Sequence, residues 1–92
     1  MERPFGLITF NSRNHVPGAR AELTMAGIDS AVMPTPRSLS AACGLSLRVA
    51  PGELSKAARL LLKSEGEGLI GLYQAEISEG RPLYHEVEIK CL

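Results

Sequence analysis

The 92-residue sequence lacks the features that would place it in a membrane or on a nucleic acid. No apolar run approaches the roughly 20 residues that a membrane span needs. The first residues also lack the apolar stretch and cleavage site of a signal peptide. The formal net charge is zero, so long-range attraction to phosphate or to acidic membranes is not expected. We therefore expect a cytoplasmic protein that binds neither a membrane nor a nucleic acid.

Cysteine is scarce, and its spacing argues against a metal site. Neither Cys43 nor Cys91 has a second Cys or His close enough in sequence to form a zinc-ligand pair. A zinc site would need both to converge with His15 and His85, and we expect none. In a cytosolic chain the two thiols are expected to be free. Cys91 is either a thiol in the C-terminal tail or a resolving partner for Cys43.

Other catalytic motifs are missing as well. Gly66 and Gly68 follow a predicted helix rather than opening one, so they do not form a phosphate loop. His15 is expected in the first turn of a helix, and His85 at an exposed strand edge. No cofactor is expected, and these residues leave open whether the chain is an enzyme.

Apolar periodicity predicts an α+β domain. An antiparallel sheet with two helices on one face follows from the order β-α-β-β-α-β, which is the ferredoxin-like arrangement. The predicted strands are residues 5–10, 28–33, 45–49 and 69–77, with an optional edge strand at 84–90, and the predicted helices follow Asn14 and Pro51. Asn14 is favoured over Ser12 as the first helix cap, because Pro17 would otherwise fall beyond the first turn. Gly27 is expected to end that helix in a left-handed conformation.

The connection between the second and third strands is long for so small a domain, and long loops often carry function. It runs from Pro34 to Gly44 and holds Cys43. Residues 38–43 could form a short helical turn, with Thr35 or Ser38 as its cap. Arg37 or Arg48 could face the sulfur, together with the backbone N–H groups that follow it, and stabilise the reactive thiolate. Cys43 would stand at the C-terminal end of this turn. The negative end of the helix dipole lies there and would disfavour the thiolate.

The same segment carries a family resemblance. The residues Pro34-Thr-Pro-Arg37, Ser40, Cys43-Gly-Leu45 and Leu47-Arg48, with Leu7-Ile-Thr-Phe10, Ala21-Glu22 and Ala26-Gly-Ile28, resemble the putative selenium/sulfur carrier protein-like family. Its members are short bacterial and archaeal domains. The resemblance implies a thiol that accepts sulfur or selenium as a persulfide or perselenide and passes it on. By residue matching Cys43 is that thiol, and Arg37, Gly44, Arg48 and Thr35 would stabilise it or bind partners.

The resemblance also implies partners and boundaries. The partners would be proteins of sulfur relay or selenium metabolism, and an exposed edge strand would allow a homodimer. We expect a single domain over residues 1–92, with a family-like core at about residues 6–75 and a C-terminal extension at 78–92.

One other function remains open from the residues alone, and a third is disfavoured. The domain could be a non-catalytic binding or regulatory module for a small ligand or a protein, with Cys43 structural. RNA binding would use sheet-surface aromatics and a basic face, and residues 45–49 supply no aromatic side chain.

Overall fold

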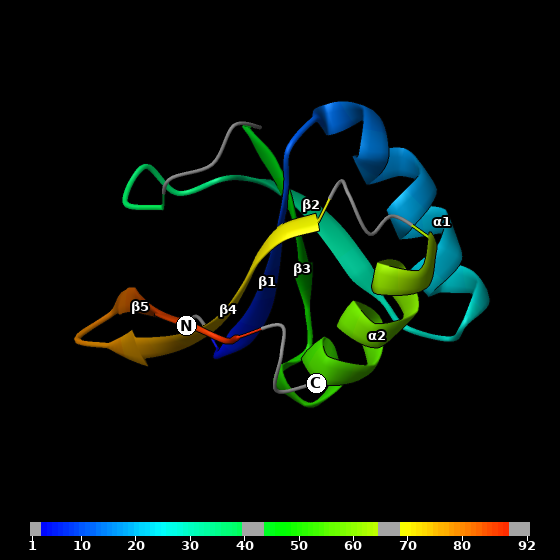
Figure 1. The fold of residues 1–92 in the computed structure, drawn as a ribbon. Coiled ribbons are helices and arrows are strands. Elements are labelled where there is room, and N and C mark those ends of the chain that lie inside the picture. The colour runs from blue at the N-terminus through cyan, green and yellow to red at the C-terminus, as the bar shows by residue number, and fades with distance from the viewer. Residues whose placement is uncertain (1–2, 40–43, 65–68, 89–92) are drawn as a thin grey trace.

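The computed structural model describes residues 3–39, 44–64 and 69–88. Within these residues a five-stranded antiparallel sheet has the strand order β2-β3-β1-β4-β5. Both helices lie on one face of this sheet (Figure 1). The strands are β1 (Phe5–Phe10), β2 (Ser30–Pro34), β3 (Leu45–Val49), β4 (Leu69–Ser78) and β5 (Arg81–Glu86), and the helices are α1 (Val16–Met25) and α2 (Leu54–Ser64). The predicted α+β class, antiparallel sheet and pair of helices are confirmed.

The central strand β1 is buried along its whole length. Because successive side chains of a strand point to opposite faces, β1 supplies two separate apolar clusters. Ile8 and Phe10 join the main core between the sheet and the helices. Phe5 and Leu7 join Ala75 of β4 on the face turned away from the helices. We call that face the open face, and those three residues the open-face cluster.

The start of α1 corrects the predicted cap. Ser12, not Asn14, is the capping residue, and its hydroxyl accepts a hydrogen bond from the backbone N–H of Asn14 at 3.3 Å. It caps a short 3-10 helix at Arg13–His15, and α1 begins only after this turn. Pro17 therefore lies in the first turn of α1, where its missing N–H costs no helical hydrogen bond. The prediction was wrong because it assumed one continuous helix.

The end of α1 follows the prediction. Gly27 has a φ of +80° and lies just beyond the helix. Its N–H donates to the carbonyl of Thr24 at 3.0 Å, and the N–H of Ile28 donates to the carbonyl of Leu23 at 2.8 Å. Leu23 and Ile28 are both buried, so this pair of hydrogen bonds with an apolar contact is a Schellman ending. Ile28 thereby belongs to the helix ending, and β2 begins at Ser30 rather than at residue 28.

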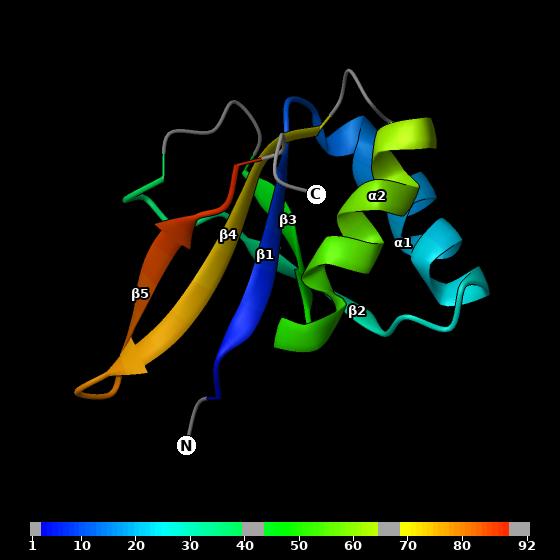
Figure 2. The same ribbon diagram turned by 60° about the horizontal axis from the view of Figure 1, so that its bottom comes forward.

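The optional fifth strand is present, with different bounds from those predicted. Glu79 and Gly80 both have positive φ, 53° and 77°, and form a two-residue turn that pairs β5 with β4. β5 therefore starts directly after the turn, at Arg81, and ends at Glu86. Val87 then packs against the main core, and its N–H donates to the carbonyl of Leu72 at 2.8 Å. Figure 2 shows this hairpin extending past the helical layer.

The strongest helical pattern is confirmed as α2, which follows a 3-10 turn at Pro51–Glu53. Its buried side chains are Leu54, Ala57, Ala58 and Leu61. The predicted stop signals Gly66 and Gly68 lie outside the described residues. In the described part of the chain, neither helix has the length and apolar character that crossing a membrane requires.

Candidate functional site

The loop between β2 and β3 is closed at its base by backbone pairing. The two strands pair in antiparallel register as far as Pro34 and Leu45. One residue further on, the N–H of Thr35 donates to the carbonyl of Gly44 at 2.9 Å. The sheet therefore sets the separation of the two ends of the loop, and residues 36–43 form the loop itself.

Side chains reinforce this closure. The hydroxyls of Thr35 and Ser46 share a hydrogen bond of 2.5 Å. Ser46 is fully buried on β3, where an unpartnered hydroxyl would be costly. Thr35, predicted to bind a partner or stabilise a thiolate, thus directs its hydroxyl to the strand beside it. Its observed position is the base of the loop.

The first residues of the loop, Pro36 to Leu39, form a tight turn. The N–H of Leu39 donates to the carbonyl of Pro36 at 3.0 Å, which closes a β-turn with Arg37 and Ser38 at its centre. Arg37 is exposed. Leu39 packs against the open-face cluster, and this apolar contact holds the turn to the sheet. The guanidinium of Arg37 is left in solvent.

Cys43 lies outside the described residues, as does most of the helical turn predicted for residues 38–43. Gly44, to which Cys43 is bonded, is exposed, and apart from its chain neighbours no atom of the described residues lies within 4 Å of the place where a Cβ would stand. The chain on the C-terminal side of Cys43 is therefore open and is fixed through the carbonyl of Gly44.

Arg48 lies elsewhere on the open face. In β3 it stands opposite Leu7 on one side and Ala31 on the other. Its guanidinium carbon lies 4.4 Å from the centre of the Phe5 ring, within the range of a cation–π interaction. Phe5 is one residue beyond Gly6, the partner of Val49, so the guanidinium extends toward the end of β3 that is farther from Gly44.

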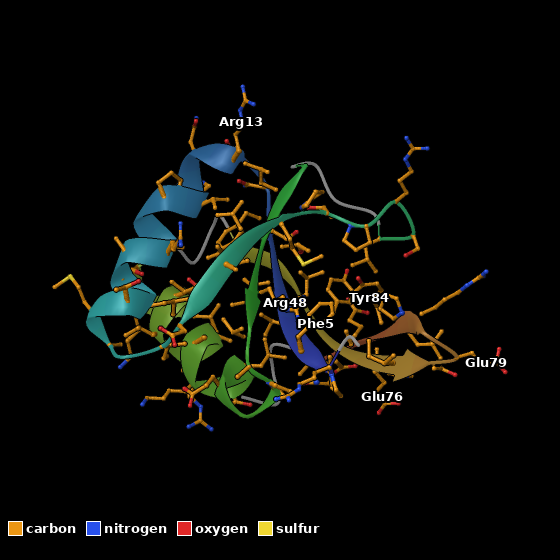
Figure 3. The ribbon with its side chains drawn as sticks, turned by 180° about the vertical axis from the view of Figure 1, so that it is seen from behind. Phe5, Arg13, Arg48, Glu76, Glu79 and Tyr84 are labelled. Atoms are coloured by element: carbon orange, nitrogen blue, oxygen red, sulfur yellow. The ribbon has the colours of Figure 1, made fainter. Side chains whose placement is uncertain are left out.

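Aromatic side chains complete the open face. The rings of Phe5 and Tyr84 meet edge to face, with 6.0 Å between their centroids and 73° between their planes. Figure 3 shows Arg48, Phe5 and Tyr84 beside one another across the sheet. The sequence reading did not single out Phe5 and Tyr84. The signal that could have found Phe5 is the nearly continuous apolar run of residues 5–10, which is typical of a strand buried on both faces.

The structure thus separates the predicted site residues into two places. Thr35 and Gly44 meet at the base of the loop, and Arg37 is exposed on the turn that follows. Arg48 lies with Phe5 on the sheet. The histidines lie apart from both. His85 is exposed on β5, 3.5 Å from the Glu76 carboxylate, and His15 ends the 3-10 turn before α1.

A comparison with protein families finds a match over most of the chain. Residues 5–73 match the model of the family described as Putative Se/S carrier protein-like. The chain belongs to this family. The matched residues contain the whole Pro34–Gly44 connection that carries the resemblance. Searches among curated proteins and among solved structures find no match.

The limits of the family match can be placed on the fold. The match begins with β1 and ends at Tyr73, inside β4. The second half of β4 and all of β5 lie beyond it. Tyr84, which contacts Phe5 and packs on the open-face cluster, therefore comes from the part of the sheet outside the matched residues.

Proposed function

We propose that this member of the Se/S carrier-like family carries sulfur or selenium on Cys43. The observation that supports this most is the family match, because its matched residues include the complete Pro34–Gly44 segment. The proposed partners are proteins of sulfur relay or selenium metabolism, and the proposed location is the cytoplasm. Such a carrier needs a nucleophilic thiolate that donor and acceptor proteins can reach, and it needs no metal or organic cofactor.

The proposed transfer consists of two thiol exchanges. In the first, the Cys43 thiolate attacks the outer sulfur of a donor persulfide. A sulfur–sulfur bond to Cys43 forms, the bond within the donor breaks, and the donor leaves as a thiolate. In the second, an acceptor thiolate attacks the outer sulfur on Cys43 and releases the Cys43 thiolate. Selenium in the outer position follows the same steps, and neither step requires an external oxidant.

The loop geometry supports this proposal in two ways. The Thr35–Gly44 hydrogen bond and the packing of Leu39 hold to the sheet the described residues on either side of residues 40–43. This anchoring lowers the conformational entropy that the loop would lose on docking with a partner. Arg37 stands exposed on the turn, where its charge is available to a thiolate, to a persulfide anion or to an acidic group of a partner protein.

We also propose that residues 1–92 form one domain with a ferredoxin-like core. Two features support this: the element order β-α-β-β-α-β of the first six elements, and the order β4-β1-β3-β2 within the sheet. In this proposal β5 is an additional edge strand beside β4.

A persulfide-labelling experiment tests the carrier proposal. The full chain is incubated with glutathione persulfide, and the product is located by intact-mass and peptide mass spectrometry. We expect one added sulfur on Cys43 in the wild type and in the control Cys91→Ser, and none on that site in Cys43→Ser. An unlabelled wild type, or equal labelling of Cys43→Ser, would overturn the proposal.

Alkylation of the native protein tests the role of Arg37. If its charge stabilises the Cys43 thiolate, Arg37→Gln will slow alkylation at neutral pH and move the midpoint of the rate profile to higher pH. Arg20→Gln, at an exposed position on α1, is the matched control and should leave the profile unchanged. If Cys43 in the native wild type resists alkylation, the alternative of a non-catalytic binding module with a structural Cys43 gains support.

A further inference from the structure

A pocket of about 410 Å³ lies at the end of the sheet that is farther from Gly44. It is formed where β1 and β2 begin and β3 ends. Its lining includes Arg3, Phe5, Asp29, Ala31, Arg48 and Val49. The volume falls within the range of pockets that bind small molecules in proteins.

The electrostatics of this pocket are unusual because Arg48, which lines it, has no anionic partner among the residues that the structure describes. Arg48 is half-buried in β3, and among residues 3–39, 44–64 and 69–88 no carboxylate is found at ion-pair distance from it. Its guanidinium lies over the Phe5 ring. That interaction engages the charge but none of the N–H donors. Buried or half-buried charges in proteins are normally paired.

A second cation strengthens the preference for an anion. Arg3 lines the same pocket and, within the described chain, also has no carboxylate at ion-pair distance. Asp29 is the one acidic side chain in the lining, and it is exposed to solvent. Ala50 and Pro51, which lead into α2, form part of the wall. The start of a helix carries partial positive charge, which acts in the same direction as the two guanidinium groups.

Apart from Ser30, the rest of the wall is apolar. Pro4, Ala31, Val49 and Pro51 line the same pocket as Arg48, and the guanidinium of Arg48 lies over the Phe5 ring. An oxyanion would accept paired hydrogen bonds from this guanidinium, and an apolar group attached to the oxyanion would contact the surrounding side chains.

We propose that this pocket binds a small organic oxyanion, a carboxylate or phosphate joined to an apolar body, through Arg48 and Arg3. The site is separate from the Cys43 loop and does not depend on the carrier function. It gives the protein a ligand-binding surface on the same sheet that anchors the loop, since Phe5, the ring beneath Arg48, also belongs to the cluster on which Leu39 packs.

Three probes with the same ring test the proposal. Full-length ¹⁵N-labelled protein is titrated with benzoate, phenyl phosphate and uncharged benzamide while its amide resonances are followed by NMR. We expect saturable shifts at Ala31, Arg48, Val49 and Ala50 with at least one of the two anions and none with benzamide. The anion that binds more tightly identifies the head group. No saturable shift with either anion, or equal shifts with benzamide, would overturn the proposal.

Variants separate specific binding from a general effect of charge. Arg48→Met keeps most of the side-chain length and should weaken anion binding by about tenfold or more. Arg3→Gln, at an exposed position before β1, cannot disturb the core and should weaken binding by several-fold. Arg37→Gln and Cys43→Ser are the controls and should bind like the wild type. Unchanged affinity in both Arg3→Gln and a folded Arg48→Met, or an equal loss in Arg37→Gln, would contradict the proposal.

Discussion

Thr35 and Ser46, eleven residues apart in the chain, join β2 to β3 through a 2.5 Å hydrogen bond between their hydroxyls. The bond lies directly beside the Thr35–Gly44 backbone pair. The two strands are therefore held together at the base of the loop by a backbone and a side-chain contact. Changes to this contact should affect both the stability of the sheet and the behaviour of the loop.

The Thr35–Ser46 pair predicts a non-additive double-mutant cycle. Thr35→Val keeps the side-chain shape and the backbone N–H, but deprives the buried Ser46 hydroxyl of this partner, and should lower the free energy of unfolding by about 1–3 kcal/mol. Adding Ser46→Ala removes the orphaned hydroxyl, so the double variant should be more stable than Thr35→Val alone. Urea denaturation measures all four free energies. Strict additivity would show that the two hydroxyls do not interact.

The contact of β1 with α2 predicts that two glycines will respond differently to alanine. A Cβ at Gly6 would stand 2.9 Å from the Cβ of Leu54 and 3.1 Å from Cγ2 of Val49. Gly6→Ala should therefore lower the free energy of unfolding by about 1–3 kcal/mol, as overpacking does. Gly52→Ala is the matched control because no atom lies within 4 Å of its Cβ position. It should be neutral or slightly stabilising, and equal losses in thermal unfolding would contradict this account.

The β4–β5 turn predicts a stabilising substitution. Glu79 has a φ of 53°, which asparagine adopts more readily than glutamate. Glu79→Asn creates the Asn-Gly sequence favoured in this turn and should raise the free energy of unfolding by a few tenths of a kcal/mol. Gly80→Ala should lower it, because the φ of 77° at Gly80 strains an L side chain. In calorimetry, the unfolding temperature of Glu79→Asn should lie above that of the wild type, and that of Gly80→Ala below it.

Elements with clear periodicity could be predicted from the sequence. The apolar spacing in residues 54–62 identified α2, and the alternation in residues 45–49 identified β3 with its bounds. Gly27 could be assigned because few residues other than glycine adopt positive φ readily. Element boundaries were harder, since they depend on turns that no periodicity marks. The 3-10 turn after Ser12 moved the first cap, and the turn at Glu79–Gly80 moved the start of β5.

The candidate site was predicted less completely, for a different reason. The long connection and its family resemblance were visible in the residues, but contacts between distant strands were not. Arg48 was expected near the loop because it is close to Cys43 in sequence. Its guanidinium instead lies with Phe5, a residue more than forty positions away. The role of Cys43 itself remains a prediction for the labelling experiment.

Both outer strands of the sheet contain proline. Pro34 ends β2 and Pro82 lies near the start of β5. Proline has no N–H to offer a neighbouring strand, and natural proteins use it at sheet edges to discourage aggregation. Without β5, the long strand β4 would itself form an outer edge. β5 therefore replaces a ten-residue edge with a six-residue edge that contains proline, which should help the protein to stay dispersed at high concentration.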